Sequence, residues 1–381
     1  MNNIALIVYG RFPTEKAYGS HIIDVANGFL KNGLIVDVIY SKTYNSKTIY
    51  QEPVEYYKNN DINFHEIDNF DFTSLKYYKI LPNILQKLIW NLGAIYWGKK
   101  LNKFISKYDA VWSTNPSVLY GLKSSNCYKI YEKHGAGRYF QKFVIKKISK
   151  NENYILVGTT KTSFNELKKL NENKAIYLTN GVDINTHIGR TKEGNLNIGY
   201  IGMLETYGKD KGVRRAFKIL KELGEDYDFE ITLIGGPNEK IDEIKNDFKN
   251  YKGEINFQYK IPKDEVPYQM SKLDIGLVPY PNDFHMSYYA SPMKIFEYAS
   301  AHVVVLASDI KSHVELDDLQ LGIHFFEESD DKSLKNELIR LITDKNLREN
   351  LISKSDKNIK NFTWEIRNKT LINFCVRSSI G

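Results

Sequence analysis

The sequence contains few of the residues that define several classes of protein. Only 2 of its 381 residues are cysteines, Cys127 and Cys375, and they lie far apart in the chain. Neither a disulfide framework nor a cysteine-based zinc site is therefore indicated, and a reducing, cytosolic compartment fits best. The 10 prolines and 24 glycines are too few for a fibrous or low-complexity chain.

Long apolar runs are also missing. The run from Ile4 to Tyr9 follows no basic leader and is shorter than a signal sequence requires, so we expect a buried strand there. The most apolar stretch elsewhere, Leu88 to Trp97, has about half of the roughly 20 residues that a membrane-spanning helix needs. We therefore expect no membrane-spanning segment.

Common phosphate-binding and hydrolytic motifs are absent. There is no GxxxxGK[ST] loop, and Gly135 and Gly137 are not followed by the third glycine of a dinucleotide fingerprint. HExxH and GxSxG do not occur either. These absences argue against P-loop nucleotidases, nicotinamide enzymes, zinc proteases and α/β-hydrolases.

What the sequence does contain is an alternation of short β-branched runs with amphipathic stretches, which is typical of parallel βα units. We expect an α/β fold with two doubly wound domains, over 1–185 and 186–364, joined by a polar linker from Asp183 to Asn195. Helices are expected at 20–31, 212–222 and 291–300. Strands are expected at 4–9, 35–40, 110–113, 129–132, 154–158, 175–178, 197–201, 230–234, 255–259, 275–279, 303–307 and 322–326.

The segment from Ser291 to Glu297 follows one of these strands. Ser291 suits a helix N-cap and Pro292 suits the first helical position. The first N–H groups, including that of Met293, would form an anion site with the Ser291 hydroxyl and the Lys294 ammonium, while Glu297 could accept hydrogen bonds from a ribose. An ordinary capped helix with an ion pair between positions i and i+3 fits the same residues.

A second anion-binding loop is expected in the same domain. The strand expected at 197–201 is followed by a loop with Gly202 and Met203, and Lys209, Lys211 and Gly212 then lead into a helix. Both loops follow strand ends, where open α/β sheets bind ligands.

In combination, these motifs resemble those of glycosyltransferase family 4, whose members have the GT-B fold. The resemblance covers nearly the whole chain and is carried, in order, by Tyr18-Gly19-Ser20, Tyr131-Glu132-Lys133-His134, Asn180-Gly181-Val182-Asp183, Lys211-Gly212 and the segment from Ser291 to Tyr298. It implies two Rossmann-like domains facing a central cleft, with the acceptor on the N-terminal domain and the nucleotide-sugar donor on the C-terminal one. It also implies that a closing helix, at about 365–381, returns to the N-terminal domain.

The resemblance further implies the chemistry of the site. Sugar transfer would retain the anomeric configuration without a metal or another cofactor. Lys211 and Lys294 would stabilise the departing diphosphate, His134 would face the donor sugar, and no nucleophile is assigned. Donor binding would involve Gly19, Gly202, Lys209, Ser291, Pro292, Met293 and Glu297.

Four residues depart from the family pattern. Met203 stands where an arginine is frequent, so phosphate neutralisation is assigned to Lys211. Tyr289 stands where a second glutamate is frequent. His302 and Tyr259 each replace a glycine.

The positive charge of the chain is concentrated in one segment. Between Lys76 and Lys150 there are 15 lysines and arginines against only Asp109 and Glu132, interleaved with tryptophans such as Trp90 and Trp97. Apolar residues recur here at helical spacing beside lysines, namely Leu85, Leu88, Ile89, Leu92, Ile95 and Tyr96 beside Lys99, Lys100 and Lys103. The pattern predicts an element that rests on an anionic bilayer, with Trp90 or Trp97 buried in it, although a core helix with a solvated basic face fits equally. A nucleic-acid partner is not expected, because no recognition motif accompanies the charge.

The sequence therefore predicts a cytoplasmic hexosyltransferase, peripheral on the inner face of the membrane, that acts on a glycan or lipid-linked acceptor in cell-surface polysaccharide or glycoconjugate synthesis. Two alternatives remain open at this point. One is a nucleotide-sugar 2-epimerase of the same fold, and the other is a non-catalytic nucleotide-sugar-binding subunit.

Overall fold

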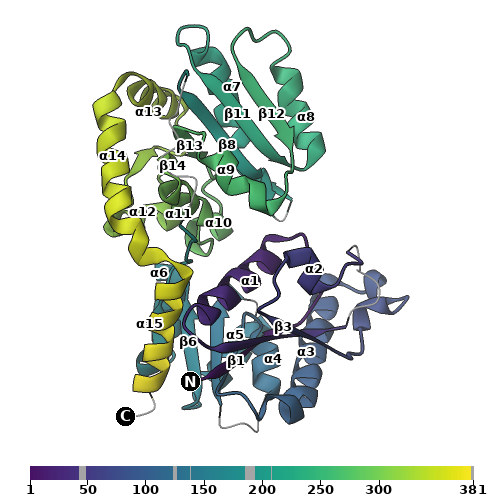
Figure 1. The fold of residues 1–381 in the computed structure, drawn as a ribbon. Helices are drawn as coiled ribbons and strands as arrows, with labels where there is room; N and C mark the ends of the chain where they lie inside the picture. The colour runs from purple at the N-terminus through teal and green to yellow at the C-terminus, as the bar shows by residue number, and fades with distance from the viewer. Residues whose placement is uncertain (43–48, 123–126, 138, 185–193, 207, 379–381) are drawn as a thin grey trace. The chain divides into compact units, whose positions relative to one another are not determined.

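The computed structural model describes residues 1–42, 49–122, 127–137, 139–184, 194–206 and 208–378. The chain forms two compact units, of which unit 1 comprises Met1–Gly181 with Trp364–Gly381 and unit 2 comprises Val182–Thr363. Each unit contains one parallel sheet flanked by helices (Figure 1). The predicted linker from Asp183 to Asn195 falls mainly on 185–193, outside the described residues.

Unit 1 is built on a seven-stranded parallel sheet of order β3-β2-β1-β4-β5-β6-β7. The strands are β1 (Asn3–Val8), β2 (Ile35–Ser41), β3 (Asn63–Ile67), β4 (Ala110–Ser113), β5 (Tyr128–Lys133), β6 (Tyr154–Gly158) and β7 (Ala175–Tyr177). The chain runs outward from β1 to β3 and then crosses back to β4, so the switch in strand order lies between β1 and β4. Residues 4–8 of β1 are all buried, as expected for a parallel strand covered on both faces.

Helices cover both faces of this sheet. They are α1 (Ala17–Leu30), α2 (Pro53–Tyr57), α3 (Asn83–Ile105), α4 (Pro116–Gly121), α5 (Tyr139–Ile148), α6 (Lys161–Lys168) and α15 (Trp364–Arg377), with short 3-10 turns at Phe72–Ser74, Tyr78–Ile80 and Glu172–Lys174. Helices α3, α4 and α5 share one core with the sheet, whereas α1 packs against α15. Asn368 of α15 donates a hydrogen bond to the carbonyl of Val25 in α1 (2.7 Å), which ties the end of the chain to its first helix.

Unit 2 is built on a six-stranded parallel sheet of order β12-β11-β8-β13-β14-β15. The strands are β8 (Asn197–Met203), β11 (Glu230–Gly236), β12 (Ile255–Tyr259), β13 (Ile275–Val278), β14 (Val304–Ser308) and β15 (Ile323–Phe326), with a small antiparallel hairpin of β9 (Glu205–Thr206) and β10 (Lys209–Asp210). The strand order reverses between β8 and β13. Ligands of open α/β sheets bind at such a reversal, outside the carboxyl ends of the strands.

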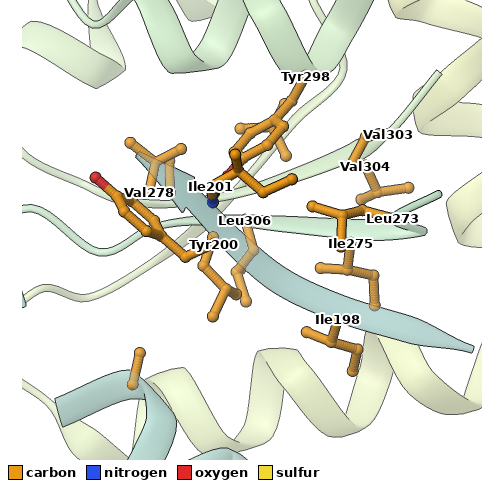
Figure 2. Packing of buried hydrophobic residues seen from close by; sticks show 14 of the residues in the cluster. Ile198, Tyr200, Ile201, Leu273, Ile275, Val278, Tyr298, Val303, Val304 and Leu306 are labelled. Carbon is orange, nitrogen blue, oxygen red and sulfur yellow. Dashed lines mark hydrogen bonds between the residues drawn. The ribbon is translucent and has the colours of Figure 1, made fainter. Parts of the chain in front are cut away.

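The helices of unit 2 complete its two layers. They are α7 (Val213–Leu223), α8 (Asn238–Asp247), α9 (Val266–Met270), α10 (Phe284–Tyr288), α11 (Met293–Ser300), α12 (Lys311–Val314), α13 (Asp331–Thr343) and α14 (Lys345–Asn358), with 3-10 turns at Lys263–Glu265, Asp317–Leu319 and Ile359–Phe362. Figure 2 shows the centre of the core, where side chains of β8 meet those of the neighbouring strands and of α11. Ile198 and Tyr200, which point to one face of the sheet, are fully buried, and Ile201 on the other face is buried too, because helices cover both faces of this parallel sheet.

Most of the predicted strands are confirmed within a residue or two, but β3 and the β9–β10 hairpin were missed. β3 lies at the edge of the sheet, and its sequence NFHEI is too polar to predict a strand. The helix predicted at 20–31 begins earlier, at Ala17, and Gly33 at φ +79° marks its end as expected.

The prediction that Trp97 inserts into a bilayer is wrong, because this side chain is 0% exposed in the core between α3 and the sheet. Trp90 also faces inward, with its ring 4.6 Å from that of Tyr9. None of the described helices combines the length and the apolar character that crossing a membrane would require.

Candidate active site

The residues predicted to bind an anion lie in unit 2, near the point where β8 and β13 diverge. These two strands pair only at Ile198 with Ile275 and at Gly199 with Gly276. Beyond that point the hydroxyl of Tyr298, from α11, accepts a hydrogen bond from the N–H of Ile201 (3.1 Å). Tyr298 thus replaces the missing strand partner and fixes α11 against the carboxyl end of β8.

Glycine is required at the end of β8. Gly202 has φ +151°, and a Cβ atom there would lie 2.7 Å from Cε of Lys294. The stem of Lys294 therefore crosses directly over the backbone of Gly202, and a larger residue would displace it. Two of the predicted site residues are thus brought into contact.

The loop that carries Lys211 is held against the neighbouring strand. The N–H of Lys211 donates to the carbonyl of Leu204 (2.9 Å), and Gly212 begins α7 at φ +77°. A Cβ atom on Gly212 would lie 2.1 Å from the carbonyl oxygen of Pro279, which directly follows β13. Only glycine allows this approach, so the Lys-Gly pair places a lysine beside the end of β13.

The electrostatics of the site suit an anion. Lys294 donates to Glu297 with Nζ to Oε2 at 2.7 Å. Burial and the positive charge of Lys294 lower the pKa of Lys211 from 10.5 to about 8, although Glu297 raises it. Two lysines thus share one carboxylate, and the uncompensated positive charge would be neutralised by a bound phosphate group.

Three buried tyrosines support the two lysines. The ammonium group of Lys211 lies 5.3 Å from the ring centre of Tyr280, and that of Lys294 lies 6.0 Å from the ring centre of Tyr298. The hydroxyl of Tyr200 donates to the carbonyl of Met203 (2.8 Å). Burial raises the pKa of each of these tyrosines, so they stay neutral and do not repel an anion.

The start of α11 differs from the prediction. The helix begins at Met293 and its N-cap is Pro292, which has an extended backbone, so the predicted Ser291 cap with Pro292 inside the helix is wrong. Pro292 itself contributes no capping hydrogen bond, because proline has no side-chain hydrogen-bond acceptor. The N–H of Ile295 donates to the carbonyl of Pro292 (3.2 Å), so Met293 and Lys294 are the residues of the first turn whose N–H groups are candidate donors to a ligand.

The other predicted positions in unit 2 occupy different surroundings. Lys209 is exposed on β10, and its ammonium group lies 3.7 Å from a carboxylate oxygen of Asp283. Tyr289 is buried. His302 has φ +56°, a backbone conformation that glycine adopts without strain, and it pairs with Asp356 at 3.0 Å.

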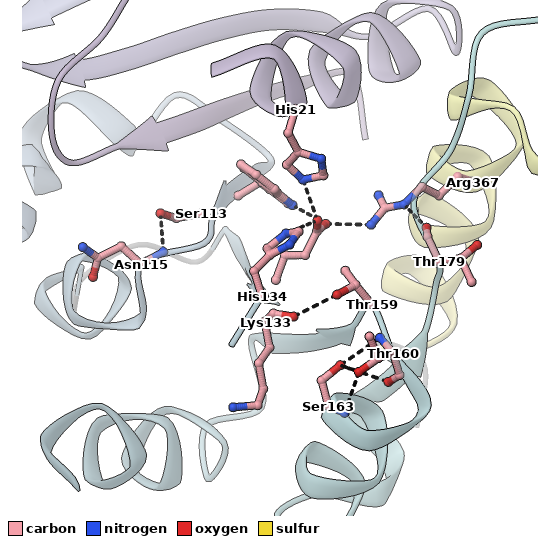
Figure 3. A network of polar contacts seen from close by, with 12 residues as sticks. His21, Ser113, Asn115, Lys133, His134, Thr159, Thr160, Ser163, Thr179 and Arg367 are labelled. Atoms are coloured by element: carbon pink, nitrogen blue, oxygen red, sulfur yellow. Dashed lines mark hydrogen bonds and ion pairs between the residues drawn. The ribbon is translucent and has the colours of Figure 1, made fainter. Parts of the chain in front are cut away.

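In unit 1, a network of hydrogen bonds centres on Glu132 of β5 (Figure 3). Its Oε1 atom contacts Nε2 of His134 at 2.8 Å and Nε2 of His21 at 2.9 Å. Its Oε2 atom accepts from Nη2 of Arg367 at 2.8 Å and from Nε1 of Trp112 at 3.0 Å. One fully buried carboxylate thus organises four side chains.

The charges of this network follow from burial. Burial alone would raise the pKa of Glu132, but Arg367 and the two histidines hold it well below its usual value, so the carboxylate is ionised. Burial lowers the pKa of His21 to about 4, although Glu132 raises it, so His21 is neutral at pH 7. Since a carboxylate only accepts hydrogen bonds, Nε2 of each histidine carries the proton that is donated to Glu132.

His21, Glu132 and His134 are also of the residue types that bind transition metals, and their ligand atoms lie within 4.8 Å of one another. The carboxylate, however, already accepts a hydrogen bond from the guanidinium of Arg367, whose positive charge opposes a cation at this place. The arrangement therefore fits a held, neutral imidazole better than a metal centre.

Sequence reasoning found His134 but missed His21, Trp112 and Arg367. They come from α1, β4 and α15, and nothing in their local sequence connects them to Glu132. Gly19 was expected just before the first helix, but it lies inside α1. A Cβ atom on Gly19 would be 2.4 Å from the hydroxyl of Tyr57 and 2.7 Å from Thr14. The space beside this glycine is filled by the chain itself, while its predicted contact with a ligand stays a prediction.

Two Rossmann-like units of this construction define the GT-B class of folds. Residues 195–344, which carry Lys211, Lys294 and Glu297, match the family model described as glycosyl transferases group 1. This match and the fold support a glycosyltransferase of the GT-B type. No curated protein matches the chain by sequence.

Solved structures share the fold at low sequence identity. A glycosyltransferase from Rickettsia africae is 15% identical, with a TM-score of 0.74 over 99% of this chain and 98% of that one. Anabaena HepE in complex with UDP is 14% identical, with a TM-score of 0.67 over 98% of this chain and 99% of that one. A variant of Staphylococcus aureus TarM in complex with Fondaparinux, α-GlcNAc-glycerol and UDP is 12% identical, with a TM-score of 0.73 over 98% of this chain and 100% of that one.

Proposed function

We propose that the protein is a retaining glycosyltransferase that moves a hexosyl group from a nucleotide-sugar donor to a glycan or lipid-linked acceptor. The observation that carries this proposal is the cationic pair of Lys211 and Lys294 with Glu297, at the carboxyl end of β8 and beside the N-terminus of α11. Its support comes from the family match over the same residues and from UDP complexes among proteins of similar fold.

In this proposal the two lysines and the N–H groups of α11, including that of Met293, bind the diphosphate. The bond between the anomeric carbon and the phosphate oxygen breaks, and the acceptor oxygen forms a bond to the same face of that carbon. The proton of the acceptor hydroxyl passes to the departing phosphate oxygen. Catalysis is then mainly electrostatic, because the fixed positive charges stabilise the leaving group more strongly as its negative charge develops. No metal or other cofactor is required.

His134 is proposed to contact substrate through Nδ1, the ring nitrogen that does not contact Glu132. We also propose a role in cell-surface polysaccharide or glycoconjugate synthesis at the cytoplasmic face of a membrane. The buried cysteines Cys127 and Cys375, which form no disulfide, and the basic segment of residues 76–150 support that location. We propose an anionic membrane surface as partner and no nucleic acid.

The proposal is tested by titrating UDP, GDP and ADP into the protein in a calorimeter and by analysing the products formed from the matching nucleotide sugars. We expect one nucleoside diphosphate to bind, and Lys294→Ala to weaken its binding by about 1.5–3 kcal/mol, the scale of hydrogen bonds to charged groups. Lys218→Ala, which removes an exposed lysine from the outer side of α7, is the matched control.

Unchanged affinity in Lys294→Ala would contradict the assignment of the diphosphate site. An epimerised nucleotide sugar, formed without any acceptor, would instead identify a 2-epimerase. Binding without either product for every donor and acceptor would identify a non-catalytic subunit.

A further inference from the structure

Helix α3 is apolar on two opposite sides. Its inner side, which includes Trp97, Leu101 and Ile105, is buried against the sheet and α4. Its outer side is exposed to solvent and continues into the preceding turn. The large apolar residues exposed there are Tyr77, Ile80, Ile84, Leu85, Leu88, Leu92 and Tyr96.

The exposed residues form one continuous strip. At 100° per residue, Ile84, Leu88, Leu92 and Tyr96 fall within about 120° of the helix circumference. Ile84 is 78% exposed and Tyr96 is 62% exposed. An apolar strip of this length is unfavourable in water and is typical of a surface that binds a partner. We call this strip, with Ile80 and Tyr77, the α3 face.

The charge of the segment that forms the α3 face has one sign. Residues 72–108 contain seven lysines and no aspartate or glutamate. Lys99 and Lys103 lie on the same side of the helix as the apolar strip, and both are exposed. On the neighbouring helix α5, Lys142, Lys146 and Lys147 are exposed beside Phe143, which is also exposed.

This combination identifies the partner by its chemistry. An apolar strip alone would fit another protein, and lysines alone would fit any polyanion. Apolar side chains flanked by lysines, in a segment from 72 to 108 that carries no acid, fit the acyl boundary and the anionic headgroups of a lipid bilayer.

The α3 face begins beside the carboxyl edge of the sheet in unit 1. The ring of Trp90 lies against Gly10, directly after β1, at 3.5 Å from the position that a Cβ atom would take. Asn91 accepts a hydrogen bond from Ser117 at the start of α4, with Oδ1 to Oγ at 2.7 Å. His134 follows β5 at the same edge of the parallel sheet, so a bilayer on the α3 face would adjoin the edge that carries this histidine.

We infer that the α3 face is a membrane-docking surface for anionic lipid, and that it presents a lipid-linked acceptor to the carboxyl edge of the sheet in unit 1. The second part of this inference rests on the proposed glycosyl transfer, whereas the first part does not. Docking places Ile80, Ile84, Leu88 and Leu92 at the acyl boundary and Lys99 and Lys103 among the headgroups. Trp90 and Trp97 take no part, because both face the protein.

The test is cosedimentation of the full chain with vesicles of phosphatidylcholine alone or mixed with phosphatidylglycerol. One variant carries Ile84→Ser, Leu88→Ser and Leu92→Ser, and a second carries Lys99→Gln and Lys103→Gln. The matched charge control is Lys249→Gln with Lys252→Gln, two exposed lysines of unit 2. Circular dichroism and the thermal midpoint show whether each variant is folded. We expect every variant to fold, because the substituted positions are exposed.

We expect the wild type and the control to bind only the phosphatidylglycerol vesicles, less tightly as salt is added, and both α3 variants to lose at least tenfold in partition coefficient. Equal binding to neutral vesicles, no binding at all, or unchanged binding of the folded α3 variants would overturn the inference.

Calorimetry with UDP, GDP and ADP on the same preparations separates this inference from the proposed function. Vesicle binding by a chain that binds none of these nucleotides would support the docking surface and contradict the glycosyltransferase. Nucleotide binding without vesicle binding would contradict the docking surface and the proposed membrane location, and would leave the proposed glycosyl transfer standing.

Discussion

The lowered pKa of Lys211 makes nucleotide affinity depend on pH. Burial and the charge of Lys294 bring this pKa from 10.5 to about 8, even though Glu297 acts in the opposite direction. This decrease in pKa corresponds to a free-energy difference of about 3 kcal/mol in favour of the neutral amine of Lys211. A bound diphosphate supplies negative charge at the same place, so we expect it to raise the pKa of Lys211 again.

The sign and size of the effect follow from this difference. Below about pH 8 the free protein already carries the proton, and affinity for the nucleoside diphosphate is constant. Above about pH 8 binding requires uptake of one proton, so affinity falls by up to about tenfold for each further pH unit. The effect ends where the pKa of the bound state is reached.

Calorimetry at several pH values, in buffers with different ionisation enthalpies, measures both the affinity and the proton uptake. Lys211→Met removes the charge, so its affinity should be weaker by about 1.5–3 kcal/mol at pH 7 and its pH dependence flat. Lys211→Arg keeps a charge at every pH used, so its profile should also be flat but its affinity higher than that of Lys211→Met. A wild-type affinity that stays constant to pH 10, or a Lys211→Met profile that still falls above pH 8, would refute the reasoning.

Three further predictions concern single residues. Glu297→Gln should weaken binding of the nucleoside diphosphate but leave inhibition by inorganic diphosphate nearly unchanged, and equal losses for the two ligands in competition assays would indicate a structural role. Gly212→Ala should lower the free energy of unfolding, measured by urea titration, by at least about 2 kcal/mol. Alanine is strained at φ +77°, and its Cβ atom would overlap the carbonyl oxygen of Pro279. An unchanged urea midpoint would contradict this prediction. Arg367→Met should cost about 3–5 kcal/mol of stability at pH 7, since it leaves the carboxylate of Glu132 buried without its cation. The ionised form of Glu132 contributes stability above its unfolded pKa of about 4. The difference in free energy of unfolding between wild type and Arg367→Met should therefore become smaller as the pH falls below that value. A difference that does not change with pH would exclude an ionic role for Arg367.

The strands of unit 2 and the gathering of its candidate anion-binding residues could be predicted largely from the sequence, because their signals are local. A buried parallel strand is a short apolar run, and the runs that end at Gly202 and at Val278 are unmistakable. The Lys211-Gly212 pair and the segment with Lys294 and Glu297 each lie within a few residues of a strand end. Since the carboxyl ends of parallel strands meet at one edge of the sheet, local position was enough to predict that these residues gather there.

Three features were decided only by the tertiary structure. The cap of α11 depends on the backbone angles of Pro292, which the preceding loop sets. The partners of Glu132 come from three elements, and Arg367 is 235 residues away in the chain, so their convergence is a property of how α1, β4 and α15 pack around β5.

The third feature is the orientation of α3. Its apolar residues occur on two sides, and helical periodicity indicates that a side is apolar without indicating which side faces the core. The structure places Trp97 inside and Ile84 outside. The reason is that Gly98 and Gly121 allow α3 and α4 to approach closely on one side only. A Cβ atom on either glycine would lie 2.3 Å from a carbonyl oxygen of the other helix. Composition alone thus determined that this segment is basic and apolar, whereas the close packing of two helices determined which of its residues water, or a membrane, can reach.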